Sequence, residues 1–595
     1  MDKSTANGKK VASHELQWNS RYCLFVSAAC VVVVSLVEQL TQFHNSTISA
    51  SMEKLCNYLP DELHLKMICQ NVFHYFGASI IKLLLHEINA DVVCYAIKLC
   101  KQDPKQGVCH IYRYTKERLH KDMKKAKWIV KDSKDLIKME ALPGICTLKA
   151  VKWLCQQIEE SLKKHIPLED FDQDDFSDIP IKVSPVEPNP LRSGDSDNIF
   201  SQRVIRNLTS FDFQTFRGYH WRGRDCNDGN NRIYPGRRPT DWDKHMDSNC
   251  NGIWGTDPED GVPYEKKFCE GSEPRGLILL GDSAGAHFHI PPEWLTATQI
   301  SAKAFANLPL ALSNELDWPQ FSSYTGFQSS TIGGWTESLY LYLRKRNHCN
   351  HRDYQNIAAN GGSSGNVNRT LKSLAREPLQ DYPVVVVYEM IGNDVCNRAS
   401  DTVARMTTPE EMRKNIMFTL NYLNSHLPKH SHVILLGLAD GRFLWNYLHH
   451  RYHPLGQLNK DITYAQFYAF MDCLQISPCK GWMSSNETLR NITSERAMQL
   501  SSVMKEVSET VAFANIKVHY VDYPQKQVKK KWLKMGGEYW QLIEPVDGFH
   551  PNQIALALGA EALWHEVQKK WPEVFGKKNP YNKKIEKIFG DQGGY

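Results

Sequence analysis

The chain has 595 residues, a formal net charge of +5, 42% hydrophobic and 23% charged residues. That length predicts several domains and a sizeable core, and the composition excludes a mainly disordered or collagen-like chain. With 71 basic against 66 acidic residues, the charge gives no case for a nucleic-acid binder that depends on phosphate contacts. No apolar run reaches the roughly 20 residues that a membrane-spanning helix needs.

Sixteen cysteines indicate an oxidising compartment. The absence of any C-x-x-C pair from the sequence disfavours zinc ribbons and thioredoxin-like motifs. Several cysteines are spaced as disulfide partners would be, namely Cys94/Cys100, Cys146/Cys155 and Cys226/Cys250. Five N-x-[ST] glycosylation acceptors fit the same secretory route: Asn45, Asn207, Asn368, Asn486 and Asn491. We therefore expect a secreted, or lysosomal and vesicular, glycoprotein.

The first apolar run lies late for a signal peptide. It covers Cys23–Val37, follows a basic stretch that has no apolar core of its own, and continues into a helix-like segment. We interpret this run as the first helix of a folded domain, with a signal-anchor as the alternative. No signal peptide is evident in this sequence.

Residues 20–105 are predicted to be helical throughout, because apolar residues recur there at spacings of three and four. Their cysteines, at positions 30, 56, 69, 94 and 100, resemble five of the six in the saposin-B family. That family consists of small helical domains that are closed by three disulfides and bind lipid. A disulfide-closed helical bundle without a lipid function is the alternative.

The saposin-B resemblance implies a disulfide pattern. It pairs Cys30 with Cys94 and Cys56 with Cys69. Ser27 occupies the sixth cysteine position, and the nearest thiol, Cys23, lies seven residues before Cys30 on the same helix face. A Cys23–Cys100 pair would therefore need a local shift.

Two later stretches carry alternating oxygen-bearing side chains, as calcium loops do. In the first, Asp170, Asp172 and Asp174 stand at positions 1, 3 and 5, and the Phe176 carbonyl is available at position 7. This stretch lacks the glycine and glutamate of an EF-hand.

The second stretch, residues 225–252, resembles calcium-binding motifs in which one disulfide joins two half-loops. Its candidate ligands are Asp225, Asn227, Asp228 and Asn230 in one half and Asp243, Asp247, Asn249 and Asn251 in the other. Uncompensated carboxylates this close would repel one another, so we expect structural Ca2+; a solvated acidic loop is the alternative.

An apolar strand is predicted to run directly into a serine-bearing turn at RGLILLGDSAG, residues 275–285. The turn satisfies both the G-x-S-x-G pattern of α/β-hydrolases and the G-D-S block of GDSL/SGNH hydrolases. Two later blocks favour the SGNH family: a second strand ends in Gly392-Asn393-Asp394, and Asp547-x-x-His550 lies near the C-terminus. An α/β-hydrolase would place several strands before the serine and its acid well upstream of the histidine.

Each residue of this SGNH constellation has a chemical role. Ser283 is the nucleophile, His550 the general base that takes its proton, and Asp547 the group that orients the imidazole. The oxyanion donors are the Ser283 N–H, the Gly361 N–H and the Asn393 amide, with Gly362 as the alternative glycine. Asp282 and Asp394 are expected to fix local loops, and His287 and His289 to lie near the site.

We therefore expect an α plus α/β protein: a disulfide-closed helical saposin-like domain, then a three-layer α/β/α hydrolase domain with a parallel sheet. The expected segments are residues 23–105 for the saposin-like domain, 106–144 for a linker or processed segment, 145–270 for a connecting region with an exposed insertion at 179–215, and 271–595 for the hydrolase.

The combination of these parts is similar to the acyloxyacyl hydrolase family, as are RGYHWRGRDCND, GDSAGAHFHIPPEW and the terminal FGDQGGY. The resemblance implies a lipase that removes secondary acyl chains from the lipid A of lipopolysaccharide and meets membranes or lipid aggregates through its saposin-like domain. It also implies two processed subunits, cut near Gly144/Ile145 and joined by Cys109–Cys473. Residues 1–26 and 179–215 depart from the family.

Two other functions remain open at this stage. The first is a phospholipase or general lipid esterase, since nothing in the sequence distinguishes the acyl chains of lipid A from those of a phospholipid. The second is a lipid carrier with an inert hydrolase domain, against which the complete Ser283, Asp547 and His550 set argues.

Overall fold

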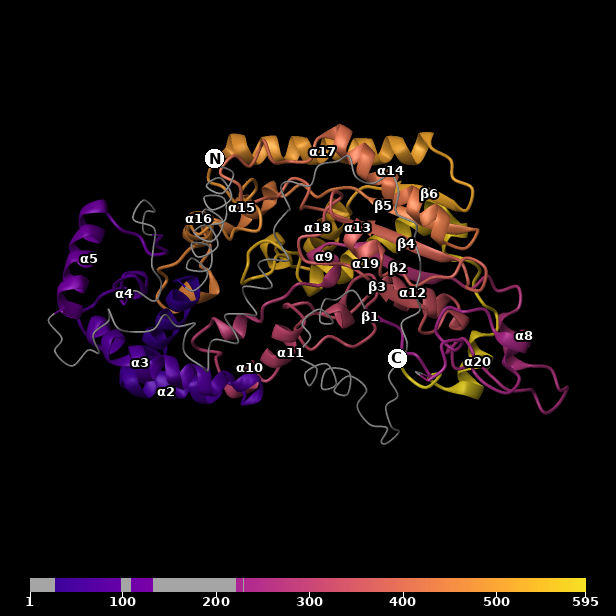
Figure 1. Ribbon diagram of the computed structural model, residues 1–595, viewed down its shortest axis with the longest axis horizontal. Helices are drawn as coiled ribbons and strands as arrows, with labels where there is room; N and C mark the ends of the chain where they lie inside the picture. Colours follow the sequence, from indigo (N-terminus) through magenta and orange to yellow (C-terminus); the bar gives the residue numbers. More distant parts are fainter. Residues whose placement is uncertain (1–26, 98–108, 132–220, 228) are drawn as a thin grey trace, which may run out of the picture.

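The computed structural model describes residues 27–97, 109–131, 221–227 and 229–595. Figure 1 shows a helical N-terminal part beside a larger part built around a sheet. Several sequence-based predictions lie outside the described residues: those for Cys23, Cys100, Cys146, Cys155, Asp170, Asp172, Asp174, Phe176, Asn207, Asp228, the insertion at 179–215 and the cut near Gly144/Ile145.

The N-terminal part is helical, as predicted for residues 20–105. Residues 116–131, which fall in the segment expected to be a linker or processed segment, also form a helix and bury Ala126 and Ile129 in the core. Its elements are a helix over residues 27–44, then α2 (Ile48–Tyr58), η1 (Glu62–His64), α3 (Leu65–Leu85), α4 (Ala90–Ala96) and α5 (Lys116–Lys131). The Thr47 hydroxyl accepts a hydrogen bond from the Ala50 N–H, which satisfies a donor that the first turn of α2 leaves open.

Among its described residues, two disulfides close this helical part. Cys30 pairs with Cys94 and Cys56 with Cys69, the pairs that the saposin-B resemblance implies. Sequence spacing alone suggested a Cys94/Cys100 pair, which is wrong because helix packing brings Cys94 to the first helix instead.

One helix among the described residues, Glu62–Leu85, is long and apolar enough by length and composition to cross a membrane. This run does not stand out in the sequence, because polar residues such as Gln70, Asn71 and His74 interrupt it. Of its apolar window, 33% is buried within the protein. Because α3 packs against α2 and carries Cys69 of a disulfide, we interpret it as a core helix of the saposin-like domain.

The larger part contains a six-stranded sheet in the order β1-β3-β2-β4-β5-β6. Its strands are β1 (Trp221–Arg222), β2 (Gly276–Gly281), β3 (Tyr354–Asn356), β4 (Val384–Glu389), β5 (Ser431–Leu436) and β6 (Ile516–Val521). Only β1 is antiparallel to its neighbour; the other pairs are parallel. Strands β2, β4 and β5 are buried along their whole length, as parallel strands covered on both faces are.

Helices cover both faces of the sheet (Figure 1). Alternate side chains of β2 and β4, such as Leu280 and Val386, pack with α14 (Pro409–His426) and α17 (Glu487–Thr510). The intervening ones pack with α12 (Leu339–Arg346) and α19 (Gln553–Lys570). This three-layer arrangement confirms the predicted α/β/α fold.

Shorter elements complete the hydrolase part. The α-helices are α8 (Tyr264–Cys269), α9 (Ser283–Ala286), α10 (Ala302–Phe305), α11 (Leu308–Ser313), α13 (Asn368–Leu371), α15 (Arg442–Leu448), α16 (Tyr464–Cys473), α18 (Gln525–Lys534) and α20 (Asn582–Phe589). The 3-10 turns are η5 (Thr240–Asp243), η6 (Pro292–Trp294), η7 (Pro319–Phe321), η8 (His348–Asn350), η9 (Pro454–Gly456), η10 (Tyr539–Leu542) and η11 (Pro572–Phe575).

The two parts share one apolar core. A single cluster joins Val37 and Leu55 of the helical part to Trp294 and Phe470 of the hydrolase part. The Gln39 side-chain amide donates to the Leu455 carbonyl across this junction, at 2.7 Å.

A disulfide, Cys109–Cys473, also crosses the junction and links residues 364 positions apart. Within the hydrolase part, Cys269 pairs with Cys349 and Cys396 with Cys479, two pairings that the sequence analysis left open. The saposin-like part is therefore covalently tied to the hydrolase part as well as packed against it.

Candidate active site

Ser283 lies where a buried strand meets a short helix. Strand β2 ends at Gly281, and Ser283 is the first residue of α9. The Asp282 carboxylate caps that helix by accepting a hydrogen bond from the Ala284 N–H at 2.9 Å. The nucleophile thus stands at the carboxyl edge of the parallel sheet, where α/β proteins bind their ligands.

The structure brings Ser283, His550 and Asp547 together from positions up to 267 residues apart. The Ser283 Oγ lies 2.7 Å from His550 Nε2, and His550 Nδ1 lies 2.5 Å from Asp547 Oδ2. The Asp547 carboxylate is itself held by the backbone N–H groups of Phe549 and His550, at 2.8 and 3.1 Å. This is the geometry of a nucleophile, a general base and an orienting acid.

The surroundings of His550 favour its role as proton acceptor. Burial lowers the pKa of the imidazole, but the adjacent Asp547 carboxylate outweighs that effect and raises the pKa above its ordinary value. A base strengthened in this way accepts the Ser283 proton more readily during attack.

The two candidate oxyanion glycines differ in availability. The Gly362 N–H already donates to the Ala359 carbonyl at 2.9 Å, whereas the Gly361 N–H has no partner among the described residues. Gly361 adopts φ +75°, a left-handed conformation that suits glycine. The Asn393 amide donates to the Gly362 carbonyl at 2.9 Å, which joins the Asn393 loop to the glycine turn beside the nucleophile.

Asp282 and Asp394 hold the loops around the site, in line with the role we expected for them. The second oxygen of Asp282 accepts from the Ile391 N–H at 3.0 Å, and burial raises the pKa of this carboxyl to about 6. Asp394 accepts from the backbone N–H and the hydroxyl of Ser364 and from the Thr407 hydroxyl.

Glu389, which the sequence analysis missed, explains the glycines of the nucleophile turn. Its carboxyl is buried at the end of β4, and a Cβ atom at Gly281 or Gly285 would lie 2.8 or 2.6 Å from it. Burial, and then the nearby Asp282 carboxylate, raise the pKa of Glu389 well above its ordinary value. A charged residue at the end of the apolar run VVVVYE was the available signal.

His287 and His289 lie near the triad without lining the pocket beside it. His289 Nδ1 is 2.8 Å from the buried Glu544 carboxylate, and the Glu544 N–H donates to the His550 carbonyl at 2.8 Å. Both ring nitrogens of the buried His287 are without a hydrogen-bond partner in the described part of the chain. The His289–Glu544 pair therefore supports the His550 loop rather than touching substrate.

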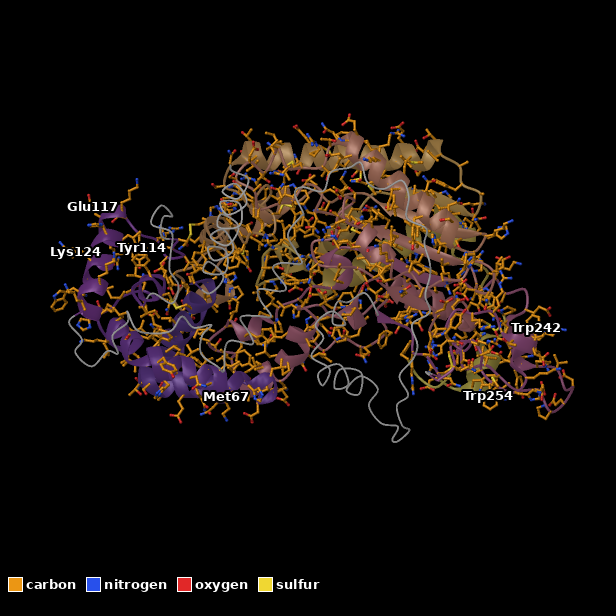
Figure 2. The ribbon with its side chains drawn as sticks, viewed as in Figure 1. Met67, Tyr114, Glu117, Lys124, Trp242 and Trp254 are labelled. Atoms are coloured by element: carbon orange, nitrogen blue, oxygen red, sulfur yellow. A yellow bond between two sulfur atoms is a disulfide. The ribbon has the colours of Figure 1, made fainter. Side chains whose placement is uncertain are left out.

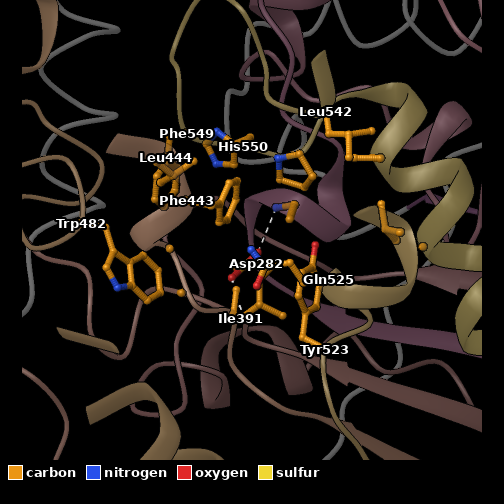
Figure 3. Close-up of a pocket in the computed structure, with 18 of the residues that line it drawn as sticks. Asp282, Ile391, Phe443, Leu444, Trp482, Tyr523, Gln525, Leu542, Phe549 and His550 are labelled. Carbon is orange, nitrogen blue, oxygen red and sulfur yellow. Dashed lines mark hydrogen bonds between the residues drawn. The ribbon is translucent and has the colours of Figure 1, made fainter. Parts of the chain in front are cut away.

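An apolar pocket opens beside the nucleophile. The empty space in the pocket and at its mouth is about 790 Å³, open solvent included, and Ser283 and His550 belong to the pocket wall. Figure 3 shows the surrounding apolar side chains, which include Phe443, Leu444, Trp482, Leu542 and Phe549. A fatty acyl chain would fit the chemistry of this lining.

The second acidic stretch is folded around a buried carboxylate. Cys226 and Cys250 form the expected disulfide. Of the predicted ligands, Asp243, Asn249 and Asn251 are buried, Asp225 and Asp247 are half-buried, and Asn227 and Asn230 are exposed. The Asn249 and Asn251 amides both donate to Glu265, a fully buried residue that the sequence analysis missed.

The electrostatics of this cluster suit a cation. Burial, together with the nearby Asp243 carboxylate, raises the pKa of Asp247 to about 6 and that of Glu265 to about 8. Asp243, Asp247 and Glu265 carry hard oxygen atoms of the kind that Ca2+ prefers, and each of these carboxylates interacts electrostatically with at least one of the others.

Comparison with known families defines the class of protein. The Saposin-like domain model matches residues 26–156, and the GDSL-like Lipase/Acylhydrolase model matches residues 277–563. Together with the serine, histidine and aspartate geometry, these matches make the chain a GDSL-type serine ester hydrolase with a saposin-like domain.

The chain also matches particular relatives. It is 55% identical to acyloxyacyl hydrolase of Homo sapiens over 95% of this chain and 92% of that protein. It is 54% identical to acyloxyacyl hydrolase of Mus musculus over 95% of this chain and 93% of that protein. A stretch of 74 residues is 32% identical to saposin-C of Cavia porcellus, over 12% of this chain and 89% of that protein. The chain belongs to the acyloxyacyl hydrolase family.

The raised pKa of Glu389 predicts how the stability of the protein depends on pH. Because its pKa is higher in the folded than in the unfolded chain, the folded state binds the extra proton, and stability falls as pH rises above the ordinary carboxyl range. Glu389→Gln keeps the neutral shape, so its melting temperature should fall less than the parent's between pH 5 and pH 8. Thermal unfolding at both values measures this. The exposed Glu259→Gln is the control, and an equal fall in all three proteins would contradict the assignment.

The shape of the pocket predicts how activity depends on the length of the substrate's acyl chain. Ala555 and Gly559, one turn apart on α19, line the pocket, and a Cβ atom at Gly559 would meet nothing within 4 Å. Gly559→Leu should therefore fill pocket space and lower kcat/KM on long-chain p-nitrophenyl esters by about tenfold, while butyrate hydrolysis stays near the parent value. Gly559→Ala is the matched control with a small effect. An equal loss on short and long esters would contradict this placement.

Proposed function

We propose that this chain removes the secondary, acyloxyacyl-linked fatty chains from the lipid A of bacterial lipopolysaccharide. The observation that carries the proposal is the apolar pocket whose wall contains Ser283 and His550, in a chain of the acyloxyacyl hydrolase family. The pocket supports an acyl substrate, and the family supports an acyl group esterified to the hydroxyl of another acyl chain.

The reaction runs through an acyl-enzyme. The Ser283 oxygen attacks the ester carbonyl while His550 Nε2 takes its proton, and Asp547 stabilises the resulting imidazolium. The Ser283 and Gly361 N–H groups and the Asn393 amide stabilise the oxyanion. His550 then returns the proton to the leaving hydroxyl of the primary acyl chain, and water releases the fatty acid by the same steps.

The saposin-like part supports the choice of an aggregated lipid substrate. An ester inside a lipid aggregate is inaccessible to a triad in solution, and a helical lipid-binding module that shares a core with the hydrolase would bring the two together. We further propose that Cys109–Cys473 joins two processed subunits and that the protein is secreted or lysosomal. The disulfides and the family both support a route through the secretory pathway.

The substrate is tested by product analysis. Incubation with defined lipid A should release non-hydroxylated secondary fatty acids, and Ser283→Ala should lower the rate by at least about 10³-fold because it removes the nucleophile. Mass spectrometry of the released acids and of the remaining lipid measures this. Release from phospholipid vesicles alone would instead identify a phospholipase, and unchanged release by Ser283→Ala would refute the catalytic assignment.

We also propose that the cluster of Asp243, Asp247 and Glu265, with its asparagines, binds structural Ca2+. Chelation by EGTA should then lower the melting temperature by several degrees, since an ion bound only to the folded state stabilises it. In Asp247→Asn, most of the calcium-dependent difference in melting temperature should be lost. Asp260→Asn is the matched control, because Asp260 is exposed and already pairs with Lys267. An unchanged melting temperature in EGTA would refute the site.

A further inference from the structure

Helix α5 packs one face against the rest of the saposin-like part and leaves the opposite face in solvent. Ala126 and Ile129 are fully buried in the shared core, with Leu119, Met123 and Val130 partly buried beside them. The helix lies at the outer end of the helical part, far from the hydrolase sheet (Figure 1).

The outer face of α5 carries Lys121, Lys124, Trp128 and Lys131, together with the exposed Glu117 one turn before Lys121. The spacing of three, four and three residues between the lysines and Trp128 places these four on one side of the helix. All four of these side chains are exposed, and Figure 2 shows Lys124 at the outer edge of the molecule. Within the described part of the chain, none of the three lysines has an ion-pair partner.

Basic residues greatly outnumber acidic residues on α5. Its 16 residues contain seven Lys or Arg and two Asp or Glu, so this one helix carries as much net charge, +5, as the whole chain. Of its two acidic residues, Asp122 pairs with Arg118. A solvent-exposed helix needs no net charge. The net positive charge of α5 attracts anions.

Two large apolar side chains, one on α5 and one at the end of α3, are exposed in this region. Trp128 is 63% exposed, and Leu85, at the end of α3, is 70% exposed. The Lys125 ammonium donates to the His86 carbonyl at 2.9 Å, which fixes the end of α3 that carries Leu85 against α5. Exposed tryptophan next to lysine is the pattern of protein surfaces that sit at the boundary between lipid headgroups and acyl chains.

We propose that the outer face of α5 docks on the phosphate-bearing surface of an anionic lipid aggregate. Lys121, Lys124 and Lys131 pair with lipid phosphates, while Trp128 inserts at the level of the headgroups. The purpose of this docking rests on the proposed function. The docked surface would hold the enzyme on the lipid aggregate from which the hydrolase part draws its acyl chains.

The test is binding of the full-length Ser283→Ala protein to vesicles, so that lipid turnover does not interfere. The protein should co-sediment with phosphatidylcholine vesicles that contain about a third phosphatidylglycerol, and less with pure phosphatidylcholine or at high salt. Reversing the charges with Lys121→Glu, Lys124→Glu and Lys131→Glu should lower the partition coefficient at least about tenfold. Trp128→Ala should lower it on both kinds of vesicle.

The matched control reverses three exposed lysines on α20, Lys583, Lys584 and Lys587, which Figure 1 places at the opposite end of the molecule. It changes the net charge equally and should alter binding less than twofold. In the Ser283 background, all variants should hydrolyse p-nitrophenyl butyrate at the parent rate, which separates loss of docking from loss of the proposed enzyme function.

Three results would overturn the proposal. Binding of the α5 variant to anionic vesicles at the parent level would show that this face does not dock. An equal loss in the α20 control would show that net charge alone attracts the protein. A change in oligomeric state by light scattering, without a change in vesicle binding, would make this face an interface between copies of the chain.

Discussion

The Asp282 carboxylate is the contact on which the catalytic geometry depends. One of its oxygens caps the helix that starts at Ser283, and the other holds the backbone at Ile391, after the neighbouring strand. The same loop carries Asn393, whose amide reaches the glycine turn. A single buried carboxylate thus fixes the nucleophile relative to the oxyanion donors, and a shift of about 1 Å there would cost much of the rate.

The second constraint is the shared core between the saposin-like and hydrolase parts. If the lipid-binding helices were joined to the hydrolase only by a flexible linker, they could bind an acyl chain without positioning it at the active site. Here the first helix is packed against the hydrolase, with Gln39 bonded to the Leu455 carbonyl and Cys109 joined to Cys473. The lipid-handling surface and the acyl pocket therefore keep a defined relation.

Much of the site could be predicted from short motifs. Ser283, Asp547 and His550 stand in blocks whose residue types and order are specific to SGNH hydrolases, so their roles followed from sequence. Glu389 and Glu265 could not be found in this way. Neither glutamate belongs to a motif block itself, and the importance of each arises from burial beside carboxylates that the fold brings close: Asp282 for Glu389, and Asp243 and Asp247 for Glu265.

By itself, then, the sequence determined the catalytic groups, the saposin-type cysteines and the class of fold, because motifs and hydrophobic periodicity are local properties of the chain. Only the tertiary structure decided that the Gly361 N–H has no partner among the described residues, that Gly559 borders the acyl pocket and that one face of α5 is exposed. These facts depend on packing and hydrogen bonding that only the folded chain brings about, and no local pattern encodes them.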